Sequence, residues 1–268
     1  MDIMARNNVK VAGRRGGVPM VFAHGFGCDQ SMWRYVAPAF EDDYETVLFD
    51  YVGAGQSEMS AYSAERYASL DGYAQDVLDV CEELDLTGAV FVGHSVSAMV
   101  GVLAAIRAPH RIGTLVMVSP SPRYIDDGDY VGGFSDADIE ELVDSLDSNY
   151  LGWSSRMAPV VMGNPDRPEL GEELTNSFCR TDPEIAKRFA RATFLSDNRE
   201  DLPKVRIPSL ILQCSSDALA PPQVGAYVHR AVAGSVLTLM RATGHCPNLS
   251  APEETITAIK AFLSAGDP

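Results

Sequence analysis

Residues 89–99, AVFVGHSVSAM, decide the fold of this chain. A run of apolar, β-favouring residues ends at Gly93, and small apolar residues follow Ser95 in a pattern typical of a buried helix. A serine between a strand and a helix, with small residues two positions before and after it, indicates a nucleophile elbow, which presents the hydroxyl at the end of the sheet. Gly93 fits this pattern, while Ser97 stands where a second glycine is usual. Alone, the stretch is also compatible with a strand followed by a serine that caps a helix.

Short apolar runs and helical patterns alternate on both sides of this stretch. The runs are nearly continuous in Val, Leu, Ile, Phe and Met, as expected for strands buried on both faces of a parallel sheet. They occupy Val18–Ala23 and residues 46–50, 89–93, 114–119, 209–214 and 236–240. Amphipathic or small-residue helical patterns occupy residues 69–84, 98–107 and 252–263. This alternation predicts an α/β protein with a mostly parallel, doubly wound sheet.

The alternation is interrupted between residues 123 and 196, where no strand pattern occurs. Four helical patterns fill this stretch, separated by turns that contain glycine, asparagine and proline. They occupy residues 136–149, Tyr150–Met162, Pro168–Arg180 and residues 182–196. We therefore expect a four-helix cap (residues 123–196) inserted into one core (residues 1–122 and 197–268), the whole forming a single structural unit.

Two further polar residues follow predicted strands and complete a catalytic pattern with Ser95. Asp217 comes just after the strand at 209–214, and His245 lies in a glycine- and proline-bounded loop after the last strand. An aspartate there is often only a helix cap, but it can also orient an imidazole. The chain order Ser95, Asp217, His245 is the order of the α/β-hydrolase triad. The α/β-hydrolase fold is therefore the predicted fold.

The sequence His24-Gly25-Phe26 follows the first predicted strand, where α/β hydrolases place one donor of the oxyanion hole. We expect the backbone N–H groups of Phe26 and Val96 to hold the oxyanion of a tetrahedral intermediate. His24 itself is expected to brace the loop by hydrogen bonding, and His94 to point into the structure.

Composition excludes several classes of partner. The 268 residues carry 21 Lys and Arg against 37 Asp and Glu, a net charge of −16. A surface this acidic repels phosphate backbones and anionic lipids, so we expect neither nucleic acid nor membrane as a partner. Five cysteines without a Cys-x-x-Cys pair, a polar N-terminal stretch and no long apolar run predict reduced thiols and a cytoplasmic location. We expect no metal ion and no cofactor.

Motifs along nearly the whole chain resemble the RsbQ group of α/β hydrolases. They are HGFGCDQSMW at 24–33, FDYVGAGQS at 49–57, GHSVSAM at 93–99, SPRY at 121–124, YLGW at 150–153, FLSDNR at 194–199 and GHCP at 244–247. The serine at 97 is itself part of that group's pattern. The plant strigolactone and karrikin receptors are similar in sequence and use the same triad.

The resemblance implies a role for each matching residue. Ser95 would be the nucleophile, His245 the base and Asp217 the residue that orients it, with Phe26 and Val96 supplying the oxyanion donors. It also implies a pocket beneath a V-shaped cap. The candidate lining residues are Phe26, Phe134, Trp153, Met157, Phe194 and Leu219. All are apolar, and those in the cap are also compatible with core packing between the cap helices.

Two functions from different classes compete. The ordered triad predicts a serine hydrolase that cleaves a small apolar ester or lactone through an acyl-enzyme. The resemblance alone implies a stress-signalling receptor, which binds and slowly hydrolyses a small hydrophobic ligand and acts through a partner phosphatase. A cofactor-free haloperoxidase activity uses the same triad in relatives and stays open.

Overall fold

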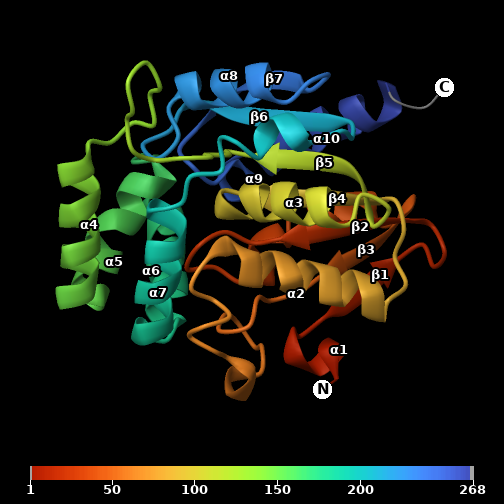
Figure 1. Cartoon of the computed structure of the whole chain (residues 1–268), viewed down its shortest axis with the longest axis horizontal. Helices are drawn as coiled ribbons and strands as arrows, with labels where there is room; N and C mark the ends of the chain where they lie inside the picture. The colour runs from red at the N-terminus through yellow and green to blue at the C-terminus, as the bar shows by residue number, and fades with distance from the viewer. Residues whose placement is uncertain (1, 266–268) are drawn as a thin grey trace.

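A computed structural model describes residues 2–265, and within them the chain forms a seven-stranded sheet in the order β1-β3-β2-β4-β5-β6-β7 (Figure 1). The strands β1 and β3 pair antiparallel, and every other neighbouring pair is parallel. The strands are β1 (Lys10–Gly13), β2 (Val18–Ala23), β3 (Tyr44–Leu48), β4 (Ala89–His94), β5 (Ile112–Val118), β6 (Ser209–Ser216) and β7 (Val236–Thr243). The predicted α/β-hydrolase fold with a mostly parallel sheet is confirmed.

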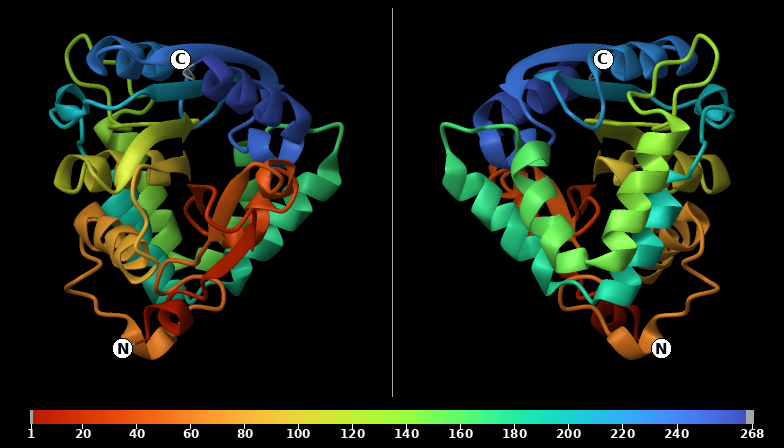
Figure 2. Two further views of the ribbon diagram at one scale, coloured as in Figure 1. Left: turned by 90° about the vertical axis from the view of Figure 1, so that its right-hand side faces the viewer. Right: turned by 90° about the vertical axis from the view of Figure 1, so that its left-hand side faces the viewer.

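Helices cover both faces of this sheet. The helices α2, α3 and α8 lie on one face, and α9 and α10 lie on the other (Figure 2). The helices outside the inserted segment are α1 (Ile3–Arg6), α2 (Leu70–Glu83), α3 (Val96–Arg107), α8 (Pro222–Ala231), α9 (Pro247–Ser250) and α10 (Pro252–Ala265). Short 3-10 helices occupy Gln30–Trp33, Ala37–Phe40, Met59–Ala61 and Leu202–Lys204. No helix within residues 2–265 combines the length and the apolar character needed to cross a bilayer.

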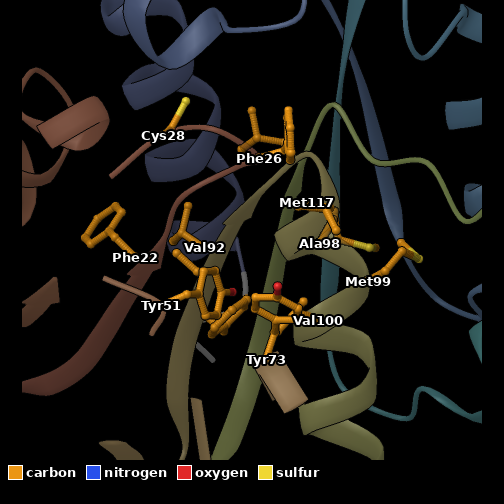
Figure 3. Close-up of a cluster of buried hydrophobic side chains, with 14 of the residues drawn as sticks. Phe22, Phe26, Cys28, Tyr51, Tyr73, Val92, Ala98, Met99, Val100 and Met117 are labelled. Atoms are coloured by element: carbon orange, nitrogen blue, oxygen red, sulfur yellow. The ribbon is translucent and has the colours of Figure 1, made fainter. Parts of the chain in front are cut away.

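The strand that leads to the elbow is the best-buried element of the sheet. All six residues of β4 are buried, and β2 and β5 flank it on either side. Its side chains join the apolar core, part of which Figure 3 shows with Tyr51, Val92 and Val100. The end of β4, where the polar residues begin, is therefore fixed by packing on both faces.

Apart from the short helices of three or four residues, the sequence patterns missed two elements, β1 and α8. All four residues of β1 are exposed, so no apolar run marks this antiparallel edge strand. Helix α8 begins with consecutive prolines and buries only Val224, Gly225 and Val228, a pattern too weak to stand out between two strong strands.

The four predicted helices of the inserted segment are all present and lie between β5 and β6 in the chain. They stand across the carboxyl ends of the strands (Figure 1), and Figure 2 shows α4 with α7 and α5 with α6 as the two arms of a V. These cap helices are α4 (Asp136–Ser148), α5 (Tyr150–Met162), α6 (Pro168–Arg180) and α7 (Pro183–Phe194). Their ends follow local signals: Ser135 forms a capping box with Asp138, and Gly163 ends α5 in the left-handed conformation with φ of 62°.

Candidate active site

Ser95 lies at a sharp turn between β4 and α3. Its φ of 57° and ψ of −123° place a non-glycine residue in a sparsely populated conformation, a strain typical of functional sites. A Cβ atom on Gly93 would lie 2.4 Å from the carbonyl oxygen of Ser97, so the turn requires glycine there. This close approach is the physical reason for the small-residue pattern in the sequence.

The structure brings Ser95, His245 and Asp217 together from three separate loops. His245 Nε2 lies 2.7 Å from the Ser95 hydroxyl oxygen, and His245 Nδ1 lies 2.7 Å from Asp217 Oδ2. All three side chains are buried. With Nδ1–H donating to the carboxylate, Nε2 is free to accept the Ser95 proton.

The charge of Asp217 is stabilised within the fold. Burial alone would raise the pKa of this carboxyl, but the His245 imidazole and hydrogen bonds outweigh it and hold the pKa below its usual value. Its second oxygen, Oδ1, accepts from the amides of Leu219 at 2.8 Å and Ala220 at 3.1 Å. Both oxygens are therefore engaged, which fixes the carboxylate in one orientation.

His94, next to the nucleophile, supports the loop that carries His245. Its Nε2 lies 2.8 Å from the carbonyl oxygen of His245. Burial, together with the nearby His245, lowers the pKa of His94 to about 3. The ring is thus neutral, and Nε2–H donates to that carbonyl. The prediction that His94 points into the structure is confirmed.

The loop after β2 packs directly on the elbow. A Cβ atom on Gly25 would lie 2.6 Å from His94 Nδ1 and 3.4 Å from Ser95 Cβ. Tyr51 N–H donates to His24 Nε2 at 3.2 Å, so His24 Nδ1–H donates to the Gly25 carbonyl at 2.9 Å. His24 therefore braces this loop, as expected.

The amides of Phe26 and Val96 face no competing acceptor. Phe26 follows Gly25, and Val96 opens α3 immediately after Ser95. Within residues 2–265 neither backbone N–H donates to a protein group. Two unsatisfied donors beside a serine hydroxyl can bind an oxyanion.

A narrow apolar cavity of about 30 Å³ adjoins Ser95 and His245. Three of the candidate lining residues, Phe26, Phe194 and Leu219, lie in its wall. Sequence reasoning missed its other walls: Cys28, His94, Tyr124, Val161, Leu174, Phe178, Thr193 and Cys246. Of these, Cys28, His94, Tyr124 and Cys246 lie within motifs quoted above, and the other four do not.

Three residues expected to line the cavity do not. Trp153 stacks on Phe178 with ring centroids 5.8 Å apart and meets the edge of Phe26 at 6.0 Å, so it lies one layer behind the wall. Phe134 pairs through its backbone with Tyr124 and Asp126 before α4 begins. Met157 packs against the apolar core. The structure places these three residues outside the wall of this cavity, and helical spacing alone does not distinguish lining from core packing.

The thiols in the cavity wall are not competing nucleophiles. Burial, reinforced by the neighbouring Asp29, raises the pKa of Cys28 to about 12, and burial also raises the pKa of Cys246. Both thiols therefore stay protonated near neutral pH. All five cysteines are free.

The loop of His245 is bonded to the cap. The His245 amide donates to the carbonyl of Val161 in α5 at 2.9 Å, and Asn164 Nδ2 donates to the Thr243 carbonyl at 3.0 Å. A Cβ atom on Gly244 would lie 1.8 Å from the Met162 carbonyl oxygen. The end of α5 and this loop therefore form one contact surface.

Comparison with known proteins places this geometry in a family. A family model described as the alpha/beta hydrolase family matches residues 20–258. The chain is 41% identical over 254 residues to the karrikin insensitive 2 receptor CA of Petunia hybrida, covering 94% of each chain. It is 35% identical over 263 residues to the strigolactone esterase D14 of Arabidopsis thaliana, covering 98% of each chain.

A solved hydrolase structure is also similar to this chain. The chain resembles olei00960, a hydrolase from Oleispira antarctica, with a TM-score of 0.95 and 42% identity over 98% of this chain and 96% of that one. Because the family model covers most of the chain and the relatives match nearly all of it, this chain belongs to the alpha/beta hydrolase family.

Proposed function

We propose that this protein is a serine hydrolase that cleaves a small apolar ester or lactone. The observation that carries the proposal is the hydrogen-bonded chain of Ser95, His245 and Asp217, with both contacts at 2.7 Å. The name of the Arabidopsis thaliana relative, a strigolactone esterase, supports the same reaction class.

The reaction would proceed through an acyl-enzyme. Ser95 Oγ forms a bond to the carbonyl carbon while its proton passes to His245 Nε2. The amides of Phe26 and Val96 hold the negative oxygen. The leaving alcohol takes the proton from His245, and water then adds by the same route to release the acid and restore the Ser95 hydroxyl. Asp217 keeps the imidazole in the required tautomer throughout.

The cavity favours a small, apolar acyl group. Pockets for drug-sized ligands measure about 300–1,000 Å³, far more than the roughly 30 Å³ beside Ser95. Aromatic and aliphatic walls offer few partners for a charged group.

A burst assay tests this proposal. With p-nitrophenyl acetate, the wild-type protein should release nitrophenolate in a burst equal to the concentration of sites. Ser95→Ala should abolish the burst and lower turnover on the order of 10³-fold or more. Ser155→Ala, which changes an exposed cap serine, serves as the control. Equal turnover by wild type and Ser95→Ala would refute the proposal.

A second candidate function is ligand reception, with slow hydrolysis as part of the signal. One observation favours it. The His245 amide donates to the Val161 carbonyl at 2.9 Å, so a displacement of the His245 backbone would also move the end of α5 in the cap. The Petunia hybrida relative is named a receptor. The partner would be a signalling phosphatase, as the resemblance to RsbQ implies. Pull-down from native extract, with wild type and Ser95→Ala, should recover a partner that depends on Ser95; no specific partner would count against reception.

A further inference from the structure

Ser97 occupies the position where the elbow pattern usually has glycine, and its hydroxyl bridges two catalytic loops. We propose that Ser97 is a positioning residue that sets the spacing of the two oxyanion donors, the amides of Phe26 and Val96. The inference rests on the proposed hydrolase function and adds a residue that the triad does not include.

The first contact joins the elbow to the loop after β2. Ser97 Oγ donates to the carbonyl oxygen of His24 at 2.5 Å, and Ser97 is completely buried. His24 lies two residues before Phe26, and Ser97 follows Val96 directly. The bond therefore links the two segments that carry the proposed oxyanion donors.

A second contact fixes the Ser97 hydroxyl itself. Tyr51 Oη lies 2.8 Å from Ser97 Oγ, and the single proton of Ser97 is already given to His24. Tyr51 must therefore donate. Burial raises the pKa of the Tyr51 phenol, so that proton is retained.

The network closes on itself through the backbone of Tyr51. The Tyr51 amide donates to His24 Nε2 at 3.2 Å, and the two rings meet edge to face with centroids 5.0 Å apart. Ser97, His24 and Tyr51 thus hold one another from three segments: α3, the loop after β2 and the loop after β3. Glycine at position 97 would leave the His24 carbonyl without this donor and would open the ring of contacts.

This arrangement predicts an effect on the transition state rather than on substrate binding. Oxyanion donors act only when they lie about 2.7–3.1 Å from the negative oxygen, and a misplacement of about 1 Å can cost about 10²-fold in rate. Loss of the Ser97 bond should let the Phe26 amide shift relative to Val96. The neutral substrate does not depend strongly on these donors, so its binding should change little.

The experiment compares Ser97→Ala with Ser154→Ala. Ser154 is a matched control in α5, equally buried, whose hydroxyl donates to the Tyr150 carbonyl at 2.8 Å. For p-nitrophenyl acetate, Ser97→Ala should lower kcat about 10- to 100-fold with KM within about twofold. Its Kd for phenylboronic acid, which forms a tetrahedral anionic adduct on serine, should rise in parallel. Ser154→Ala should match the wild type in both.

Tyr51→Phe provides a second variant in case Ser97→Ala unfolds. It removes the phenol that donates to Ser97 but keeps the hydrogen bond from Ser97 to the His24 carbonyl. It should therefore lower kcat less than Ser97→Ala does and leave KM unchanged. The inference is overturned if folded Ser97→Ala keeps kcat and the boronate Kd within twofold of wild type, or if KM rises as much as kcat falls. Ser95→Ala distinguishes failure of the positioning role from failure of the proposed hydrolase function. If Ser95→Ala also retains turnover and boronate binding, the hydrolase function itself fails.

Discussion

The elbow and the cap build the two sides of one cavity by different means. On the elbow side, hydrogen bonds of 2.5–2.8 Å from His94, Ser97 and His245 hold neighbouring loops and side chains in place. On the cap side, the walls are apolar side chains such as Val161, Leu174 and Phe178. Hydrogen bonds fix direction and distance, whereas apolar contacts fix volume.

Because the two sides are built differently, we expect them to control different properties of the reaction. In the proposed reaction the elbow side sets where charge develops and where protons move, so its variants should change the rate. The cap side sets which molecules fit, so its variants should change selectivity. The hydrogen bond from the His245 amide to the Val161 carbonyl is one of the contacts that join the two sides.

The largest expected effect comes from the elbow side. Asp217→Asn keeps the shape of the side chain but favours the wrong tautomer of His245, so kcat for p-nitrophenyl acetate should fall on the order of 10³- to 10⁴-fold. Steady-state kinetics and circular dichroism on the same samples check this. A loss below tenfold in a folded variant would mean that Asp217 does not orient the base.

His94 provides the next largest effect, on stability at low pH. The unfolded imidazole binds a proton below about pH 6.5, whereas burial and His245 keep folded His94 neutral down to about pH 3. Protons therefore favour the unfolded chain, and stability falls as the pH drops from about 6.5 towards 3. Between pH 6.5 and 5 the loss is about 2 kcal/mol.

His94→Gln removes this titration while keeping a donor for the His245 carbonyl. Urea unfolding of both proteins at pH 7 and pH 5 measures the difference, because the groups that face position 94, namely His245, Asp217 and His24, are common to both. The wild type should lose about 2 kcal/mol more than the variant on acidification. Equal losses would show that His94 is not held neutral.

The smallest expected effect belongs to the cap. Phe178 lines the cavity from α6 and contacts Phe26 with ring centroids 5.7 Å apart. Phe178→Ala should enlarge the cavity and raise the kcat/KM ratio of butyrate to acetate esters about tenfold. Phe134→Ala, at a partly buried position outside the cavity wall, should leave the ratio unchanged. An unchanged ratio in Phe178→Ala would mean that the cap does not select by size.

The same difference explains what the sequence could predict. Six strands and four cap helices followed from apolar periodicity, because burial on both faces of a sheet or on one face of a helix leaves a regular pattern. Ser95, Asp217 and His245 were found because each follows a strand, and parallel strands end at one edge of the sheet. The exposed strand β1 had no such pattern.

The cavity walls could not be predicted in the same way. Trp153 and Phe178 are both buried aromatic residues of the cap, yet only Phe178 lines the cavity, because the packing of α5 against α6 decides which ring is in front. Helical periodicity shows which face of a helix is buried, but it does not show which buried side chains reach the cavity wall. Ser97 stood out only as a departure from glycine, and its partners lie 46 and 73 residues away in the chain.

The proposed reaction depends on Ser95 acting as a nucleophile that His245 activates. Incubation with a fluorophosphonate, followed by intact mass measurement and peptide mapping, tests it most directly. We expect a single adduct on Ser95, formed at least about 100-fold more slowly in His245→Ala. An adduct on another residue would mean that Ser95 is not the nucleophile, and equal rates in both proteins would mean that His245 does not activate it.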